Sequence, residues 1–250
     1  MLGLYCVSLR PVPLGKASTF EAIAFDAHTH VYRHEPSTAA EAAVLRGLVS
    51  PSAPVLDVGC AATGRTARLL RDLGGQVTAI DINHGAVREY AKSGDRTDIA
   101  LTTADMTELP FTNGSFGLVL VGFHGFDYLL AADTRAQAIS EFGRVLTPGG
   151  QLVLNTFNPI GYTFNPLLNR SKSGLARWSR YVTSGRTFRP DFIDVNGLRL
   201  QQRRLGSVVN DVERSGGFTL ASAADASGTP RPSWLLSLSA AEPYLVFEKS

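Results

Sequence analysis

VLDVGCAATGRTARLL, residues 55–70, is the stretch of sequence that decides the fold. Residues 55–58 are mostly apolar and predict a buried strand, whereas residues 65–73 predict a helix. Gly59 lets the backbone turn sharply between them, and Gly64 is expected to let the helix pack close to the strand. The N-terminus of such a helix presents free N–H groups to an electronegative ligand. The stretch therefore predicts a strand–turn–helix unit that binds a ligand.

Strands and helices alternate along the chain beyond this unit. Five short strands that alternate with helices predict an α/β fold with a parallel, doubly wound sheet. In such a sheet the ligand lies outside the carboxyl ends of the strands, so the residues just after each strand are functional candidates. The further strands are expected at residues 77–80, 99–103, 116–121 and 151–157, with two last strands at 218–221 and 244–247. Asn196-Gly197 predicts the tight turn of a hairpin between residues 193 and 200.

The composition is that of an ordinary soluble globular protein. Apolar residues make up 44% and charged residues 18% of the chain, which excludes a disordered polypeptide, and a net charge of +2 excludes a nucleic-acid-binding polycation. Two cysteines cannot support a disulfide framework, so we expect a reducing, cytoplasmic location. No run of residues approaches the ~18 apolar residues that span a bilayer, so no membrane partner is expected. The apolar start lacks a basic region and is interpreted as an N-terminal extension rather than a signal peptide.

The glycine turn resembles the first motif of the class I S-adenosylmethionine-dependent methyltransferases, which usually reads D-x-G-x-G-x-G. In that family the acidic residue, here Asp57, lies near the amino-acid part of the cofactor. This chain departs from the pattern, because Ala61-Ala62-Thr63-Gly64 stands where the family has Gly-x-Gly. One residue is extra and the middle glycine is missing; an alanine at positive φ costs ~1–2 kcal/mol. The spacing also fits G-x-A-x-x-G, a weakened dinucleotide fingerprint, so this loop alone does not separate a methyl donor from a nicotinamide cofactor.

Segments downstream carry the resemblance further, over residues 37–157. Asp81 ends the second strand, where a carboxylate accepts hydrogen bonds from ribose hydroxyls in both classes of enzyme. In the methyltransferases an Asp after the third strand, here Asp105, receives the adenine amino group, and the next residue, Met106, packs near the ring. The Tyr-x-x-x-Lys pattern of short-chain dehydrogenases does not occur. Motifs similar to those around the family's fourth and fifth strands are Pro110-Phe111, Ser115-Phe116, Arg144–Leu146 and Pro148–Gly150.

The resemblance implies a Rossmann-like, doubly wound sheet of seven strands, mostly parallel with the last strand antiparallel, and a small cap inserted after the fifth strand. It implies methyl transfer from S-adenosylmethionine. We divide the chain into an N-terminal extension or lid (1–36), a cofactor-binding Rossmann-like core (37–157), a basic, aromatic cap insertion (158–206) and the C-terminal part of the core sheet (207–250). The cofactor contacts that the resemblance implies are Tyr32, Asp57, Gly59, Cys60, Ala61, Gly64, Asp81, Ile82, Asp105, Met106 and Phe123.

The segment after the fourth strand is expected to hold the reacting groups. Methyl transfer is an in-line displacement, for which the protein mainly holds the nucleophile close and aligned. A base is needed only if the nucleophile must lose a proton, and His124 is the candidate because the pKa of histidine lies near neutrality. A packing role for His124 is the alternative, and Asp127 would either orient it or cap the next helix. The expected acceptor contacts are Asp127, Tyr128, Asn158 and Tyr162.

The insertion suggests the chemistry of the acceptor. Between Arg170 and Arg204 there are nine Lys or Arg residues and two Asp residues, interleaved with aromatic side chains. A basic cap favours an acidic, carboxylated or phosphorylated small molecule, although contact with RNA and a merely solvated surface are alternatives. No Asn/Asp-Pro-Pro-aromatic motif follows the fourth strand, which argues against methylation of nucleic-acid bases, and O-methylation is favoured over N-methylation. The oligomeric state, including a homodimer, is left open.

FDAHTHV, residues 25–31, resembles the metal-binding His-x-His of amidohydrolases. Those enzymes place it on a barrel strand, whereas the pattern here is not that of a barrel, so no metal is expected. The segment is instead expected to fold over the cofactor. Two other functions remain open: a degenerate, non-catalytic cofactor-binding protein of the same fold, and an NAD(P)-dependent oxidoreductase.

Overall fold

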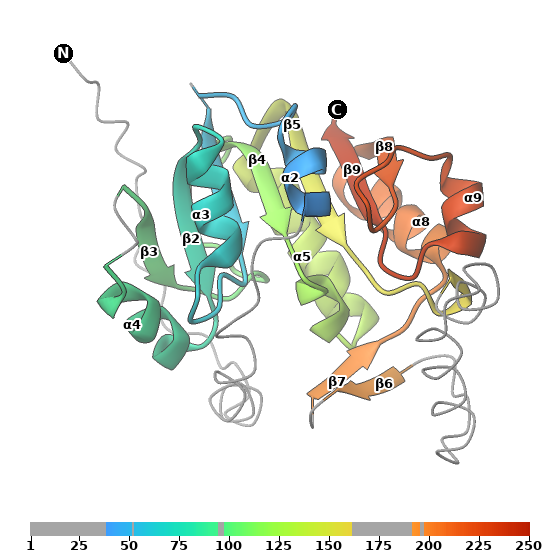
Figure 1. Ribbon diagram of the computed structural model, residues 1–250, viewed down its shortest axis with the longest axis horizontal. Helices are drawn as coiled ribbons and strands as arrows, with labels where there is room; N and C mark the ends of the chain where they lie inside the picture. The colour runs from blue at the N-terminus through green and yellow to red at the C-terminus, as the bar shows by residue number, and fades with distance from the viewer. Residues whose placement is uncertain (1–38, 52, 95–97, 162–191, 196–197) are drawn as a thin grey trace.

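The computed structural model describes residues 39–51, 53–94, 98–161, 192–195 and 198–250 (Figure 1). The predicted contacts Tyr32 and Tyr162 and the segment 25–31 lie outside these residues. No helix among the described residues is both long enough and apolar enough to cross a membrane.

The central sheet confirms the predicted fold. Seven of the described strands form it: β1 (Pro54–Val58), β2 (Gln76–Asp81), β3 (Ala100–Thr103), β4 (Phe116–Val121), β5 (Leu146–Asn155), β8 (Phe218–Ala224) and β9 (Tyr244–Lys249). Their order is β3-β2-β1-β4-β5-β9-β8 (Figure 1). The strands from β3 to β5 pair in parallel, whereas β9 is antiparallel to both of its neighbours. The last strand in the chain is therefore the antiparallel one, as predicted.

Helices cover both faces of the sheet and bury one apolar cluster on each (Figure 1). The first face is packed by α2 (Ala39–Leu45), α3 (Arg65–Asp72) and α4 (His84–Lys92). The second face is packed by α5 (Ala132–Val145) and α8 (Leu205–Gly216). Alternate residues of β1 separate between the two clusters, because Val55 faces the first and Leu56 the second. A strand buried on both faces holds its carboxyl end, and hence the glycine loop, in a fixed position.

Three local features differ from the sequence prediction. The segment between the last two strands contains α9 (Ser233–Ser239), a helix that we did not predict; burial of Leu236 stabilises this short helix. The fifth strand, expected to begin at residue 151, begins earlier: residues 147–150 belong to β5, because Leu146 already pairs with Phe116 before the register shifts. A 3₁₀ helix, η1 (Gly125–Tyr128), follows β4.

A small hairpin lies outside the central sheet. Its strands, β6 (Phe192–Val195) and β7 (Leu198–Gln201), pair in antiparallel fashion, which confirms the predicted hairpin, while the Asn-Gly turn itself lies outside the described residues. The hairpin lies against η1, and β7 leads directly towards α8 (Figure 1). It therefore places residues distant in the sequence beside the segment that follows β4.

Candidate cofactor and acceptor site

The carboxyl ends of the central parallel strands meet at one edge of the sheet. Val58, the last residue of β1, is level with Ile80 of β2 and with Val121 of β4. The loops that follow these three strands therefore lie next to one another. From β1 the chain continues to β2 on one side, whereas β4 is the neighbour of β1 on the other side. At such a reversal of strand order, doubly wound sheets bind their ligands in a crevice outside the carboxyl ends of the strands.

The glycine loop has a left-handed backbone conformation at three positions. Gly59, Ala61 and Gly64 all have positive φ, at 81°, 51° and 55°. Ala61 thus occupies the place of the missing middle glycine, and the extra residue lies between it and Gly64. Arg68 Nη1 donates a hydrogen bond to the carbonyl of Thr63 at 2.5 Å, which fixes this longer part of the loop. We infer that the insertion is absorbed after the second left-handed residue.

The position of the Tyr90 ring requires a glycine at residue 64, and the sequence did not indicate this contact. We expected it to allow close packing against the strand, but a Cβ at this position would lie 1.9 Å from the ring of Tyr90, in α4. Tyr90 is fully buried, and its burial raises the pKa of the phenol to about 12. By contrast, a Cβ at Gly59 would meet nothing within 4 Å, which leaves room beside the exposed first turn of the loop.

Changing Ala61 to glycine is expected to stabilise the protein by roughly 1 kcal/mol, because relief of the left-handed strain exceeds the added entropy of the unfolded chain. Urea unfolding measures the change. Ala62→Gly is the matched control: Ala62 is buried and lacks positive φ, so this second change should destabilise. A loss of stability in Ala61→Gly would contradict the strain ascribed to this residue.

Asp57 supplies an incompletely bonded carboxylate beneath the loop. The side chain is fully buried in β1, and Oδ2 accepts a hydrogen bond from the Thr66 hydroxyl at 2.8 Å. Oδ1 is buried and has no hydrogen-bond partner among the described residues. Burial raises the pKa of Asp57 to about 7, and the Thr66 hydrogen bond opposes this rise. An acceptor oxygen without a donor in a buried site is what a cationic or N–H-bearing ligand group would satisfy.

Asp81 joins the end of β2 to the glycine loop. Its Oδ2 accepts the Ala61 backbone amide at 2.8 Å, and its Oδ1 accepts the Asn83 amide at 2.9 Å. Burial raises its pKa, and the hydrogen bonds from the Asn83 and Ala61 amides oppose that rise. Asn83 itself caps α4 by accepting the Ala86 amide. A carboxylate has further lone pairs, so Asp81 can still accept ribose hydroxyls.

The remaining predicted adenosine contacts lie after β2 and β3. Asp105 Oδ1 accepts both the amide and the hydroxyl of Thr107 at 2.8 Å, which orients the carboxylate. Met106 is partly buried and packs against the apolar cluster beneath α5 and α8, and Ile82 directly follows Asp81. Cys60 is buried under the loop. Their contacts with a cofactor stay predictions.

A buried ion pair that sequence reasoning missed supports the loop. Arg65, the first residue of α3, donates two hydrogen bonds of 2.8 Å to Glu41 of α2. Its guanidinium also lies 4.8 Å from the centroid of the Phe123 ring, after β4. Phe123 has φ 46° and is 39% exposed, so its ring is accessible at the crevice. The one signal in the sequence is that Glu41 lies four residues before Leu45, on the same buried face of α2.

His124 is buried and held in a stack. Its ring lies 3.7 Å from that of Phe157 with an interplanar angle of 15°. Nδ1 is 3.8 Å from Asp127 Oδ2 and makes no hydrogen bond among the described residues. Burial, and secondarily the charge of Arg65, lower the pKa of His124 to about 3. The imidazole is therefore neutral near pH 7 and weakly basic, which favours a packing or hydrogen-bonding role over proton abstraction.

Two of the predicted acceptor contacts connect structural elements. Asp127 accepts the Thr156 hydroxyl at 2.7 Å and the Phe157 amide at 2.8 Å, thereby tying η1 to the chain after β5. It does not cap the next helix: α5 has Ala131 at its N-cap without a side-chain hydrogen bond, so that alternative is wrong. Asn158 Nδ2 donates to three carbonyls at the end of α9 and is fully buried. Tyr128 is half-buried in η1. Acceptor contact by these residues stays a prediction.

The described residues fit S-adenosylmethionine, the cofactor that the resemblance of the glycine loop and the fold imply. Asp57 offers a buried acceptor without a donor, Asp81 offers a carboxylate held by backbone amides, and Gly59 leaves the first turn open. These groups suit the amine and hydroxyl donors of that molecule.

Comparisons with known proteins find similarity to methyltransferases. Residues 56–154 match the family model of a methyltransferase domain. Demethylmenaquinone methyltransferase from Beutenbergia cavernae is 36% identical over 108 residues, which are 43% of this chain and 42% of that protein. The enzyme of the same name from Renibacterium salmoninarum is 32% identical over 134 residues, which are 52% of this chain and 54% of that protein. The chain thus matches about half the length of these curated relatives.

Solved structures share the fold. The CcbJ methyltransferase from Streptomyces caelestis has a TM-score of 0.67 at 16% identity, over 91% of this chain and 98% of that one. An S-adenosylmethionine-dependent methyltransferase from Mesorhizobium loti has a TM-score of 0.56 at 20% identity, over 84% of this chain and 98% of that one. The methyltransferase-domain match over residues 56–154 favours a methyl donor over a nicotinamide cofactor for this glycine spacing. The sheet order and the glycine loop agree with the match of residues 56–154 to a methyltransferase domain, and the chain has the fold of solved S-adenosylmethionine-dependent methyltransferases.

Proposed function

We propose that this protein transfers a methyl group from S-adenosylmethionine to a small-molecule acceptor. The observation that carries the proposal is the convergence of Asp57 and Asp81 on a glycine loop with three left-handed residues. Asp57, Asp81 and Asp105 would hold the cofactor, with the backbone of Gly59 and Ala61. When bound, the cofactor supplies a sulfonium-activated methyl group.

The chain's own part in the reaction is to bind, orient and exclude water. Phe123 and His124 follow β4 beside the glycine loop. The guanidinium of Arg65, which is paired with Glu41, lies over the Phe123 ring. His124 is neutral near pH 7 and presents an acceptor nitrogen, so its proposed role is to orient a donor group rather than to remove a proton. Proximity then accounts for most of the rate increase.

The acceptor is proposed to be an acidic small molecule that is methylated on oxygen. The two relatives described above are named for a small molecule, demethylmenaquinone, which supports a small-molecule acceptor. The basic insertion between Arg170 and Arg204 supports an acidic group, and the sequence lacks the motif of many amino methyltransferases after β4. A scaffold that has lost tight cofactor binding through its altered loop is the second candidate.

Calorimetric titration with S-adenosylmethionine, its demethylated product and NADP tests the proposal. We expect saturable binding of the first two ligands only. Asp81→Asn should weaken that binding by about 10–100-fold, because a hydrogen bond to a charged group contributes ~1.5–3 kcal/mol. Asp72→Asn is the matched control, since Asp72 lies at the end of α3 with its side chain 63% exposed. Absence of binding to all three ligands would support the degenerate scaffold instead.

A further inference from the structure

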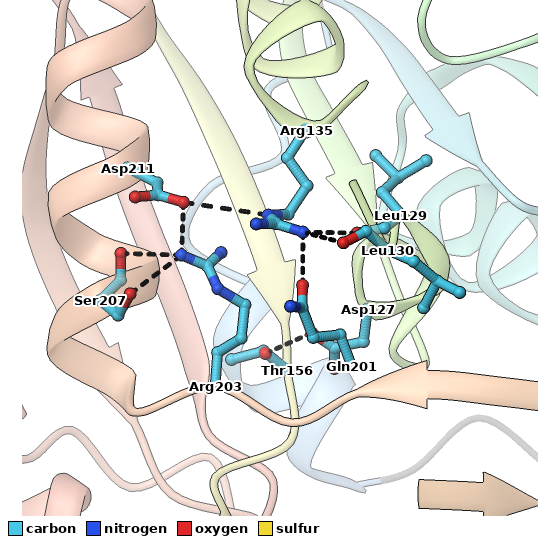
Figure 2. Close-up of polar contacts among 9 residues, drawn as sticks. All are labelled: Asp127, Leu129, Leu130, Arg135, Thr156, Gln201, Arg203, Ser207 and Asp211. Carbon is cyan, nitrogen blue, oxygen red and sulfur yellow. Dashed lines mark hydrogen bonds and ion pairs between the residues drawn. The ribbon is translucent and has the colours of Figure 1, made fainter. Parts of the chain in front are cut away.

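Two buried arginines lie side by side near the segment that follows β4 (Figure 2). Arg135 is in the first turn of α5, and Arg203 lies between β7 and α8. Their side chains are only 8% and 9% exposed. Figure 2 shows both guanidinium groups directed towards Asp211 of α8.

The charges of this pair are incompletely balanced by the described residues. Asp211 Oδ2 accepts a hydrogen bond from Arg203 Nη2 and lies 3.9 Å from Arg135 Nε, so one carboxylate serves two guanidinium groups. The nearby Asp127 also attracts both arginines electrostatically, but its oxygens are hydrogen-bonded to Thr156 and Phe157, and burial raises its pKa to about 7. Burial, and then the charge of Arg203, lower the pKa of Arg135. Uncompensated buried charge is costly, which favours an additional anion.

Both side chains also have donors that lack an acceptor. Arg203 Nη1 and Arg135 Nε are buried and make no hydrogen bond among the described residues. Other donors of the pair are used: Arg135 Nη1 donates to Gln201 and, at 2.8 Å, to the carbonyls of Leu129 and Leu130, while Arg203 Nη2 donates to Ser207. The two guanidinium groups are thus held in place, and each keeps one N–H donor without an acceptor among the described residues. An oxyanion with two or more oxygens is the ligand that such a pair suits.

The pair lies on the acceptor side of the crevice. Gln201 ends β7, which packs against η1, and Asp127 of η1 is bonded to Thr156 after β5. Asp81, the ribose candidate, lies across β1 from β4 and β5. Asp211, which accepts a hydrogen bond from Arg203, has a side chain that is 37% exposed, so the cluster extends to the surface at α8.

We propose that Arg135 and Arg203 form a subsite that binds a carboxylate or phosphate group of the methyl acceptor. The assignment rests on the proposed methyltransferase function. The basic composition of the insertion suggests only that the acceptor carries an acidic group. The proposed subsite gives that group a position.

Thermal unfolding of the full chain in sodium phosphate, compared with sodium chloride at equal ionic strength, tests the subsite. We expect phosphate to raise the Tm by about 3–5 °C at a concentration tenfold above its Kd. Arg203→Gln should abolish the shift, and Arg203→Lys should reduce it because the fork is lost. Arg204→Gln is the matched control, since the neighbouring Arg204 is exposed and this variant should keep the full shift.

Several results would overturn the subsite. Equal effects of phosphate and chloride on the unchanged protein would do so without any variant, even if Arg203→Gln failed to fold. A phosphate shift that survives in Arg203→Lys at full size, or one that Arg204→Gln abolishes, would place the anion elsewhere. Titration with demethylated cofactor separates this proposal from the proposed function. Its affinity should be unchanged by phosphate and by Arg203→Gln; competition between the two ligands would place the anion in the cofactor site.

Discussion

Replacing Gly64 with alanine is expected to destabilise the protein by about 2–5 kcal/mol, the sum of two separate costs. The first is backbone strain, because Gly64 has φ 55° at the start of α3. The second is a clash, because the new Cβ would lie 1.9 Å from the Tyr90 ring. That ring is fully buried in α4, so it cannot move away from the new Cβ without displacing its neighbours. Urea unfolding followed by circular dichroism measures the loss.

Gly59→Ala is the control that separates the two costs. Gly59 also has positive φ, at 81°, but a Cβ there would meet nothing within 4 Å. It should therefore carry the strain of ~1–2 kcal/mol without the clash. Tyr90→Ala removes the ring that the new Cβ would meet. In the double variant Gly64→Ala with Tyr90→Ala, the clash part of the destabilisation should therefore disappear, and the difference is measured as a coupling energy. If Gly64→Ala were no less stable than Gly59→Ala, the packing of α4 on the loop would not be the constraint we infer.

These two glycines show which features of the loop could be predicted from the sequence and which could not. Residues 55–64 indicated a turn, a helix start and a ligand from local pattern alone, and the parallel, doubly wound sheet followed from the alternation of strands and helices. The partner of Gly64 was not readable, because Tyr90 lies 26 residues further along and belongs to the next helix. Ala61 is similar: its sequence departs from the motif, yet its backbone adopts the left-handed conformation that glycine favours.

The polar groups that support the site were mostly beyond sequence reasoning. Glu41 and Arg65 are 24 residues apart, and nothing in either local pattern pairs them. Arg203 was counted as one of many basic residues of the insertion, but the hairpin brings it beside Arg135 of α5. Charge composition thus predicted an acidic ligand without locating it. Only the tertiary fold distinguishes a buried arginine such as Arg203 from its exposed neighbour Arg204.

Asp57→Asn is expected to make the unliganded protein more stable, increasingly so at high pH. The folded pKa of Asp57 is about 7, raised by burial from the ordinary value of 3.8. Between these values the folded state binds more protons than the unfolded state, so the contribution of Asp57 to stability is lost as the pH rises through this range. At 1.36 kcal/mol per pKa unit, the advantage of the variant should grow by roughly 2–3 kcal/mol between pH 5 and pH 8.

The difference between the variant and the unchanged protein isolates this residue. Asp127, whose burial also raises its pKa to about 7, and His124, whose burial lowers its pKa to about 3, titrate in both proteins, so their contributions cancel in the difference. Asp72→Asn, at an exposed position on α3, should show a difference from the unchanged protein that varies little with pH. Urea unfolding at a series of pH values gives the comparison. A difference that is flat from pH 5 to pH 8 would refute the burial cost assigned to Asp57.

The same substitution should weaken S-adenosylmethionine binding by at least about tenfold. Cofactor binding would then explain why the fold keeps a carboxylate whose burial lowers the stability. In the unliganded protein Oδ1 has no donor, so the carboxylate is a destabilising group that the fold nevertheless keeps at the end of β1. A bound cationic amine would supply that donor and favour ionised Asp57, so cofactor affinity should rise with pH through about 7 in the unchanged protein. This rise should be absent in Asp57→Asn. A variant that gains stability yet binds the cofactor with unchanged affinity would show that the buried carboxylate does not face the methyl donor.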